Sequence, residues 1–245
     1  MTVPYRRILA IEASGESCSV ALLDGEQGIR SRVSRESRKH AQMLLPMADD
    51  LLLEAGLSLS HIEALAFARG PGSFTGLRIG AGVIQGLAYG LQIPVLCANS
   101  LEVLALSACP SASAVDEHVV VATLDARMNE IYWAAYRVAG GRLQELQAPT
   151  LSSPNELNEG VAALRTASSS ACRVVGNGAG NLASDPLDGE VQPSAESLLR
   201  LIDEGWSETI EYRDAWELEL LYLRNEVAWQ KRKRIRDNAS RSAAS

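Results

Sequence analysis

The order of hydrophobic and polar positions predicts strands and helices that alternate along the chain. Apolar runs at 6–12 and 17–23 are joined by a short polar turn, and a second turn leads to a third strand near 28–34. Apolar residues then recur every three or four positions from 38 to 55, which indicates a helix with one apolar face. By the same criteria we expect strands at 62–68 and 94–98, helices at 74–91, 154–165, 195–204 and 222–230, a helix capped by Ser100 and ending near 108, and loops at 166–172 and 176–189.

The opening pattern recurs in the middle of the chain. Residues 119–143 repeat the order of residues 6–29: an apolar strand ending in an acid, a short polar turn, a second strand and a hairpin with glycine. The two acids are Glu12 and Asp125. This self-similarity predicts an internal duplication, and therefore an α/β protein with two related lobes and a cleft between them.

The repeat also sets the expected domain boundaries. We expect a first lobe over residues 1–103 and a smaller second lobe, with a return segment, over residues 104–229. Residues 230–245 are basic, polar and poor in apolar side chains, so we expect a disordered tail.

Composition narrows the class of protein. The 245-residue chain has a formal net charge of −7, so its body does not attract nucleic acid by charge alone. Its four cysteines are scattered without a CxxC pair, which argues against a zinc knuckle and favours a reduced, cytoplasmic protein. We find no signal peptide pattern, and the apolar run at 74–91 is too interrupted for a membrane span.

The stretch GPGSFTGLRIG, residues 70–80, lies between an expected buried strand and an expected helix. That position favours anion binding, because glycines admit a close approach and the first turn of a helix offers free N–H groups. Ser73 and Thr75 add hydroxyl groups. The alternative is that Ser73 only caps the helix. The stretch is no P-loop, since it lacks the Gly-Lys-Ser/Thr sequence.

Glycine also recurs every fourth residue along the helix that comes next, at 72, 76 and 80 and again at 82, 86 and 90. Each glycine inside a helix costs about 1 kcal/mol relative to alanine. Close approach of another element is the usual reason for such a series. The sequence leaves open whether that element belongs to the same domain or to another chain.

Candidate catalytic groups are few. Glu12 and Asp125, facing each other across the cleft, have the chemistry to hold Mg²⁺ or to act as acid and base. The alternative is that each carboxylate caps its own turn. The three histidines, at 40, 61 and 118, form no metal-binding pair, and no nucleophile elbow occurs. The sequence therefore resembles that of a nucleotide-binding protein that lacks a recognisable group of catalytic residues.

Several of these segments together resemble the TsaB family, also called YeaZ, whose members take part in making threonylcarbamoyladenosine on tRNA. The resemblance extends from about Ile8 to Trp229. It rests on ILAIEAS at 8–14, RKHAQMLLP at 38–46, GPGSFTGLRIG at 70–80, GLAYGLQIPVLCANSLE at 86–102, DARMNEIYWA at 125–134 and YLRNEVAW at 222–229. It implies the fold of actin-like ATPases, with duplicated ribonuclease H-like lobes.

The resemblance also implies a role without catalysis. The family has a catalytic sister, TsaD, whose Asn-His-Leu-Glu-Gly-His run binds a metal through two histidines. Here Ser100 and Leu104 stand at the two histidine positions, and neither suits a metal. We therefore expect no catalytic residue, no metal and no cofactor of its own, with ATP or ADP bound only at the partner complex.

On this resemblance the protein is a subunit that binds and activates TsaD for threonylcarbamoyl transfer to the adenosine next to the tRNA anticodon. TsaE is then a partner through the complex, tRNA is the substrate of the complex, and the isolated chain self-associates as a homodimer away from any membrane. The expected partner interface is Leu44, Leu51, Arg78, Gly80, Gly82 and Gly86. The expected remnant of a nucleotide cleft is Glu12, Gly70, Gly72, Ser73, Thr75, Gly76 and Asp125.

Two other functions remain open from the sequence. One is a stand-alone enzyme, either an ATPase or a glycoprotease-like peptidase, against which the missing metal ligands count. The other is RNA binding through the basic cluster of the tail, Lys231, Arg232, Lys233, Arg234 and Arg236.

Overall fold

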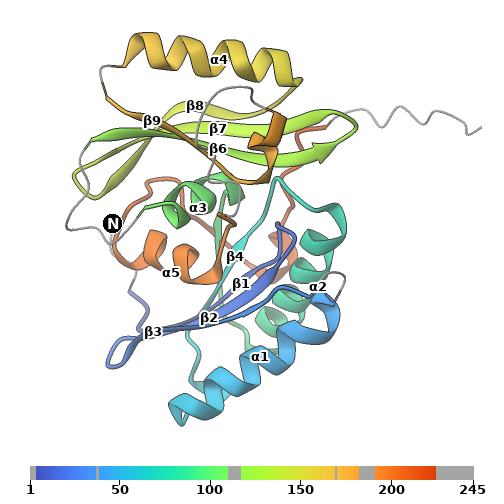
Figure 1. Ribbon diagram of the computed structural model, residues 1–245. Helices are drawn as coiled ribbons and strands as arrows, with labels where there is room; N and C mark the ends of the chain where they lie inside the picture. The colour runs from blue at the N-terminus through green and yellow to red at the C-terminus, as the bar shows by residue number, and fades with distance from the viewer. Residues whose placement is uncertain (1–3, 37–38, 110–116, 169, 182–190, 225–245) are drawn as a thin grey trace, which may run out of the picture.

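The computed structural model describes residues 4–36, 39–109, 117–168, 170–181 and 191–224. Within them two β-sheets alternate with layers of helices (Figure 1). From the bottom to the top of Figure 1 the layers are helices α1 and α2, the first sheet, helices α5 and α3, the second sheet, and helix α4.

The first sheet has six strands in the order β10-β5-β4-β1-β2-β3. Strands β1, β4 and β5 are parallel, whereas β2, β3 and β10 each run antiparallel to a neighbour. This is the ribonuclease H-like arrangement. The strands are β1 (Arg7–Glu12), β2 (Cys18–Asp24), β3 (Gly28–Ser34), β4 (Ala64–Ala68), β5 (Val95–Ala98) and β10 (Glu211–Arg213).

Both faces of the first sheet are covered, which explains why its central strands are apolar throughout. Along β1, Leu9 and Ile11 face α1 (His40–Ala55) and α2 (Phe74–Leu91). Ile8 and Ala10 face the opposite layer of helices. That layer consists of α3 (Ser100–Ser107) and α5 (Ala195–Asp203).

The second sheet repeats the beginning of the first. Strands β6, β7 and β8 form an antiparallel meander, and β9 pairs in parallel with β6, as β4 does with β1. Helix α4 leads to β9 as α1 leads to β4, so the duplication predicted from the sequence is confirmed. The elements are β6 (His118–Arg127), β7 (Glu130–Ala139), β8 (Arg142–Ser152), α4 (Pro154–Ala167) and β9 (Cys172–Val175).

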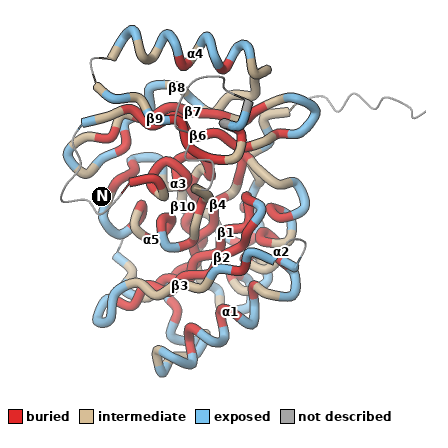
Figure 2. Tube along the Cα trace, viewed as in Figure 1, coloured by how far each residue is buried: buried red, intermediate tan, exposed pale blue. Residues whose placement is uncertain are grey.

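The two sheets share a hydrophobic core. Ala10 and Ala66 of the first sheet belong to the same buried cluster as Val120 and Ala122 of the second, and α3 and α5 fill the space between them. Figure 2 shows the buried residues running through both sheets and this middle layer. The lobes therefore meet over an extended apolar interior.

The chain crosses between the sheets twice. After α3 it builds the second sheet, and then α5 and β10 return to the first, where β10 pairs with β5. The backbone N–H of Leu221 donates to the carbonyl of Arg69 at 2.9 Å, which holds the last described residues against the first sheet.

The structure differs from the expectations in three places. Strands β9 and β10 were not predicted, because each has only three or four residues and lies among polar residues. The cap of α3 is Asn99, whose Oδ1 accepts from the N–H of Leu101 at 2.8 Å, and not Ser100. Residues 222–224 are not helical, and the remainder of the helix expected at 222–230, like the basic tail, lies outside the described residues.

Candidate functional site

The glycine loop that precedes α2 is held from two sides. The N–H of Ser73 donates to the carbonyl of Ser14, just beyond the end of β1, at 2.7 Å. The N–H of Gly70 donates to the hydroxyl of Ser100 at 3.0 Å, and its carbonyl accepts from the N–H of Ser100 at 2.9 Å. Ser73 also caps α2, since its hydroxyl accepts from the N–H of Gly76 at 3.3 Å.

Two glycines, one in this loop and one in the first turn of α2, allow the segment after β1 to cross the start of the helix. A Cβ atom on Gly72 would lie 2.4 Å from the carbonyl oxygen of Ser14, and one on Gly76 would lie 2.1 Å from that of Ala13. Any side chain there would collide with the backbone. The first turn of α2 is thus covered by the backbone of Ala13 and Ser14. In a phosphate-binding loop, the corresponding space would be open to the ligand.

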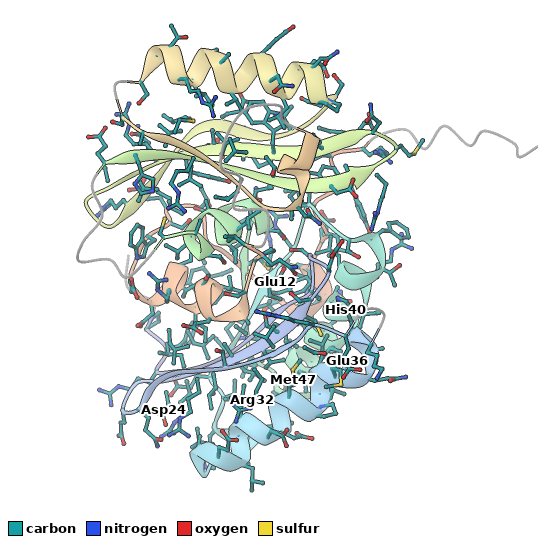
Figure 3. All side chains as sticks on the ribbon, viewed as in Figure 1. Glu12, Asp24, Arg32, Glu36, His40 and Met47 are labelled. Atoms are coloured by element: carbon teal, nitrogen blue, oxygen red, sulfur yellow. The ribbon has the colours of Figure 1, made fainter. Side chains whose placement is uncertain are left out.

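Glu12 lies inside the molecule at the end of β1 (Figure 3). Its Oε1 accepts from both the N–H, at 2.8 Å, and the hydroxyl of Ser14. Its Oε2 has no hydrogen-bond partner among the described residues. Burial raises the pKa of Glu12 to about 7, against the opposing effect of the bonds from Ser14. Glu12, Ser14 and the glycine loop therefore form one connected cluster.

Asp125 occupies the matching position at the end of β6 but has different surroundings. It is half-exposed, and its Oδ1 accepts from the N–H of Arg127 at 2.8 Å. The Arg127 guanidinium lies 3.0 Å from its other oxygen. No hydrogen bond or ion pair among the described residues joins Asp125 to Glu12. Each carboxylate accepts the N–H two residues ahead, which is the geometry of the turn-capping alternative.

The helix glycines divide into two groups. A Cβ on Gly80 would lie 2.7 Å from the ring of Phe67, so Gly80 serves packing inside the chain. Gly82, Gly86 and Gly90 have open space where a Cβ would be. On the same helix Phe74 and Tyr89 are 58% and 75% exposed.

The expected interface is corrected accordingly. Leu44 and Leu51 are fully buried against the first sheet, and Gly80 is also interior, so these three residues present nothing to a partner. Arg78, Gly82 and Gly86 are exposed. The Arg78 guanidinium carbon lies 3.7 Å from the centre of the Phe74 ring, and its Nε donates to the Tyr222 hydroxyl at 3.3 Å.

The two positions compared with metal ligands have structural roles. The hydroxyl of Ser100 accepts from Gly70, and Leu104 is buried beside Gly176. Within the described residues no group of three or more His, Cys, Asp or Glu side chains is arranged to hold a metal ion. Nor does any helix in these same residues have the length and apolar character to cross a membrane.

One feature was missed in the sequence. A cavity of about 330 Å³ lies between the sheets, with Glu102 of α3 and Tyr136 of β7 in its wall. The other lining residues come from the ends of β4 and β5, from β8 and from the C-terminal segment. Because these segments are far apart in the chain, no local motif marks them.

Comparisons with known proteins agree on the relationship. A protein-family model described as "TsaD: tRNA N6-adenosine threonylcarbamoyltransferase" matches residues 28–178. The "tRNA threonylcarbamoyladenosine biosynthesis protein TsaB" of Escherichia coli (strain K12) is 38% identical, over 92% of this chain and 97% of its own length. The protein of the same name from Haemophilus influenzae is 36% identical, over 91% and 96%.

A solved structure described as "YeaZ from Pseudomonas aeruginosa" is 39% identical to this chain. It superposes with a TM-score of 0.75 and covers 91% of this chain and all of its own. The identity, the coverage and the shared architecture agree: the chain belongs to the TsaB family, also called YeaZ.

Proposed function

We propose that the protein acts in the biosynthesis of threonylcarbamoyladenosine on tRNA, as a non-catalytic subunit that binds and activates TsaD. The observation that carries the proposal is the exposed face of α2, where Gly82, Gly86 and Gly90 leave open backbone beside the exposed rings of Phe74 and Tyr89. Exposed glycines weaken a helix, so an isolated chain gains nothing from them. A second helix packed closely on this face would use them.

The absence of catalysis is supported by the positions that match the sister's metal ligands. Ser100 is engaged with Gly70, and Leu104 fills space in the core. A leucine offers no atom to a metal. The protein would therefore contribute a surface to the reaction, with any ATP or ADP bound at the partner complex.

The partner surface that we propose is the exposed side of α2: Arg78, Gly82 and Gly86, extended by Phe74, Tyr89 and Gly90. TsaD binds there directly, TsaE joins through the complex, and tRNA is the substrate of the assembly. The same surface mediates a homodimer when TsaD is absent, because association would cover the exposed rings of Phe74 and Tyr89. Since tRNA is modified in the cytoplasm, we place the protein there.

Reconstitution tests this function. The protein is purified with and without TsaD from the same source, and tRNA modification is measured. We expect co-purification and a reaction that requires both chains, with no turnover of ATP or peptide by this chain alone. Modification by TsaD at full rate in its absence, or peptide hydrolysis by the pure chain, would contradict the proposal.

A substitution on α2 tests whether the interface lies on this helix. Gly86→Leu introduces a side chain into the proposed helix contact, and overpacking of about 1–3 kcal/mol corresponds to a roughly five- to 150-fold weaker affinity. The control is Ala163→Leu on the exposed side of α4, on the far side of the molecule. Circular dichroism and sedimentation check the fold and the homodimer. Normal TsaD binding by folded Gly86→Leu would place the interface elsewhere.

A further inference from the structure

The cavity between the two sheets has the size and wall of a small-molecule site. Its volume of about 330 Å³ is at the lower end of the range for ligand pockets. It lies in the middle layer of the molecule, where the start of α3 and the strands β7 and β8 approach the segment that leads to β10. None of the glycines of α2 that face outward lines this cavity.

Tyr136 provides the first indication of a ligand. The residue is 3% exposed and lines the cavity, and its hydroxyl makes no hydrogen bond to a described residue. A tyrosine hydroxyl that borders a cavity and has no protein partner is free to accept a hydrogen bond from a ligand. Tyr136 of β7 is the cross-strand partner of Glu145 of β8, and Glu102 lines the same cavity. Burial raises the pKa of Tyr136 well above its ordinary value, and the charges of Glu102 and Glu145 raise it further.

The charges of the wall provide a second, independent indication. Its one basic residue among those described is Arg69, which is already paired with Glu211 at 2.5 Å. Glu102 is 4% exposed and accepts a hydrogen bond from the hydroxyl of Thr209 at 2.9 Å, but it forms no ion pair with a described residue. Glu145, at the rim, forms none either. Glu102 and Glu145 are thus two carboxyl groups of the wall without a cationic partner among the described residues. Burial raises the pKa of Glu102, and a bound cation would favour its charged form.

We propose that this cavity binds a small organic ammonium ion, whose N–H groups donate to Glu102, Glu145 and the hydroxyl oxygen of Tyr136. An ammonium group has three donors, and Glu102, Tyr136 and Glu145 give the wall of this one cavity three acceptors. A metal ion suits the wall less well, since no group of three or more ligating side chains was found in the described part of the chain. The four-carbon scale of a simple alkylamine fits within the volume.

Titration calorimetry on the full-length protein tests this, with butylammonium and 1,4-diaminobutane as probes and butyrate and 1-butanol as comparisons of equal length. We expect saturable binding of the two amines only. Because the assay needs no TsaD, its result is separate from that of the reconstitution. Failure of both amines to bind, or equal binding of butyrate, would overturn the proposal.

Variants assign the binding to the cavity. Glu102→Gln keeps the shape of the side chain, and removing the charge should weaken butylammonium binding about tenfold or more, as expected for a hydrogen bond between charged groups. Tyr136→Phe should weaken it less. Glu159→Gln, on the exposed side of α4, is the matched control and should bind normally.

A second variant, at an exposed residue, covers the case in which Glu102→Gln does not fold. Should Glu102→Gln fail to fold by circular dichroism, Glu145→Gln at the rim tests the same charge without disturbing the core. Unchanged affinity in folded Glu145→Gln and Tyr136→Phe would overturn the assignment of the ammonium site to this cavity.

Discussion

In the first lobe the strand that opens the meander ends in Glu12, and in the second lobe the corresponding strand ends in Asp125. Each carboxylate accepts the N–H of the residue two positions ahead. Glu12 is fully buried with its pKa raised to about 7, whereas Asp125 is half-exposed beside the Arg127 guanidinium. The shared bond belongs to the repeated scaffold, whereas the raised pKa of Glu12 results from its complete burial.

The glycine loops extend the comparison. After β4, Gly72 and Gly76 press against the carbonyls of Ser14 and Ala13, and after β9 a Cβ on Gly176 would lie 2.1 Å from the carbonyl of Thr123. The first loop crosses the residues that directly follow β1, and the second crosses β6 near its end. The close crossing in the first lobe is therefore part of the duplicated architecture, and it needs no phosphate to explain it.

The two loops lead to different elements. The first leads to the 18-residue helix α2, while the second leads to a 3-10 turn, Asn177–Asn181, at which this described stretch of the chain ends. Among the described residues, the same scaffold thus presents an exposed helix after one loop and a short turn after the other. The proposed partner surface lies on the longer of these two elements.

The largest effect is expected where the two loops are alike. Gly76→Ala and Gly176→Ala each place a methyl group about 2 Å from a backbone oxygen that cannot move aside, and each should lower the free energy of unfolding by about 3 kcal/mol. Gly176 also has φ of +93°, which adds strain for alanine. Chemical denaturation measures the change. Retention of full stability by either variant would mean that its loop can shift.

The second effect concerns the two carboxylates. Since the folded state holds the Glu12 proton more tightly than the unfolded chain, wild-type stability should fall as pH rises from about 4.5 through about 7 and then level off. Glu12→Gln should remove this slope and be more stable at pH 8, by up to about 3 kcal/mol. Asp125→Asn is the control and should keep the slope. Chemical denaturation of the wild type and both variants across this pH range measures the slope. A slope that persists in Glu12→Gln would show that Glu12 is not its cause.

A smaller effect is expected at the turn that carries Arg127, Met128 and Asn129, all with positive φ. Arg224 supports this turn, because its Nη2 donates to the carbonyl of Ala126 at 3.1 Å and pairs with Glu130. Arg224→Ala should cost about 1–2 kcal/mol and speed hydrogen exchange within the turn.

The control for this prediction is Arg142→Ala, at the start of β8. Arg142 pairs with Glu208 in an exposed position, so its loss should change stability by about 0.5 kcal/mol or less. Equal effects of the two substitutions would show that Arg224 does not support the strained turn.

The smallest effect has the opposite sign. Gly82→Ala and Gly86→Ala fill open space on α2, and each should stabilise the isolated chain by about 1 kcal/mol through helix propensity alone. If a TsaD helix packs against these glycines, the added methyl groups should not strengthen TsaD binding, although they stabilise the isolated chain. Thermal unfolding and a binding titration on the same samples test both parts; lower stability would mean that these positions are packed after all.

The fold was largely predictable because its central strands are apolar and its helices have one apolar face. Ile8 to Glu12 and Ala64 to Ala68 could be assigned from residue type, and the recurrence of Glu12 as Asp125 revealed the duplication. The short strands β9 and β10 depend on partners far away in the chain, so local sequence carried little sign of them.

The candidate site was less predictable for a physical reason. An apolar or glycine-rich face indicates that a helix packs closely against another element. It does not tell whether that element belongs to the same chain or to a partner. Leu44 and Gly80 pack within the chain, whereas Gly82, two residues further along α2, faces outward. The cavity could not be predicted from the sequence, because Glu102 and Tyr136 are brought into one wall only by the packing of the two lobes in the folded protein.

The return of α5 and β10 to the first sheet has a consequence for synthesis on the ribosome. Ile8, Ala10 and Ala66 are buried partly by α5, yet that helix is translated only after the whole second sheet. At about 5–20 residues per second, one face of the first sheet waits on the order of ten seconds for its cover. Nascent chains in that interval expose apolar surface, so they are natural clients for ribosome-associated chaperones.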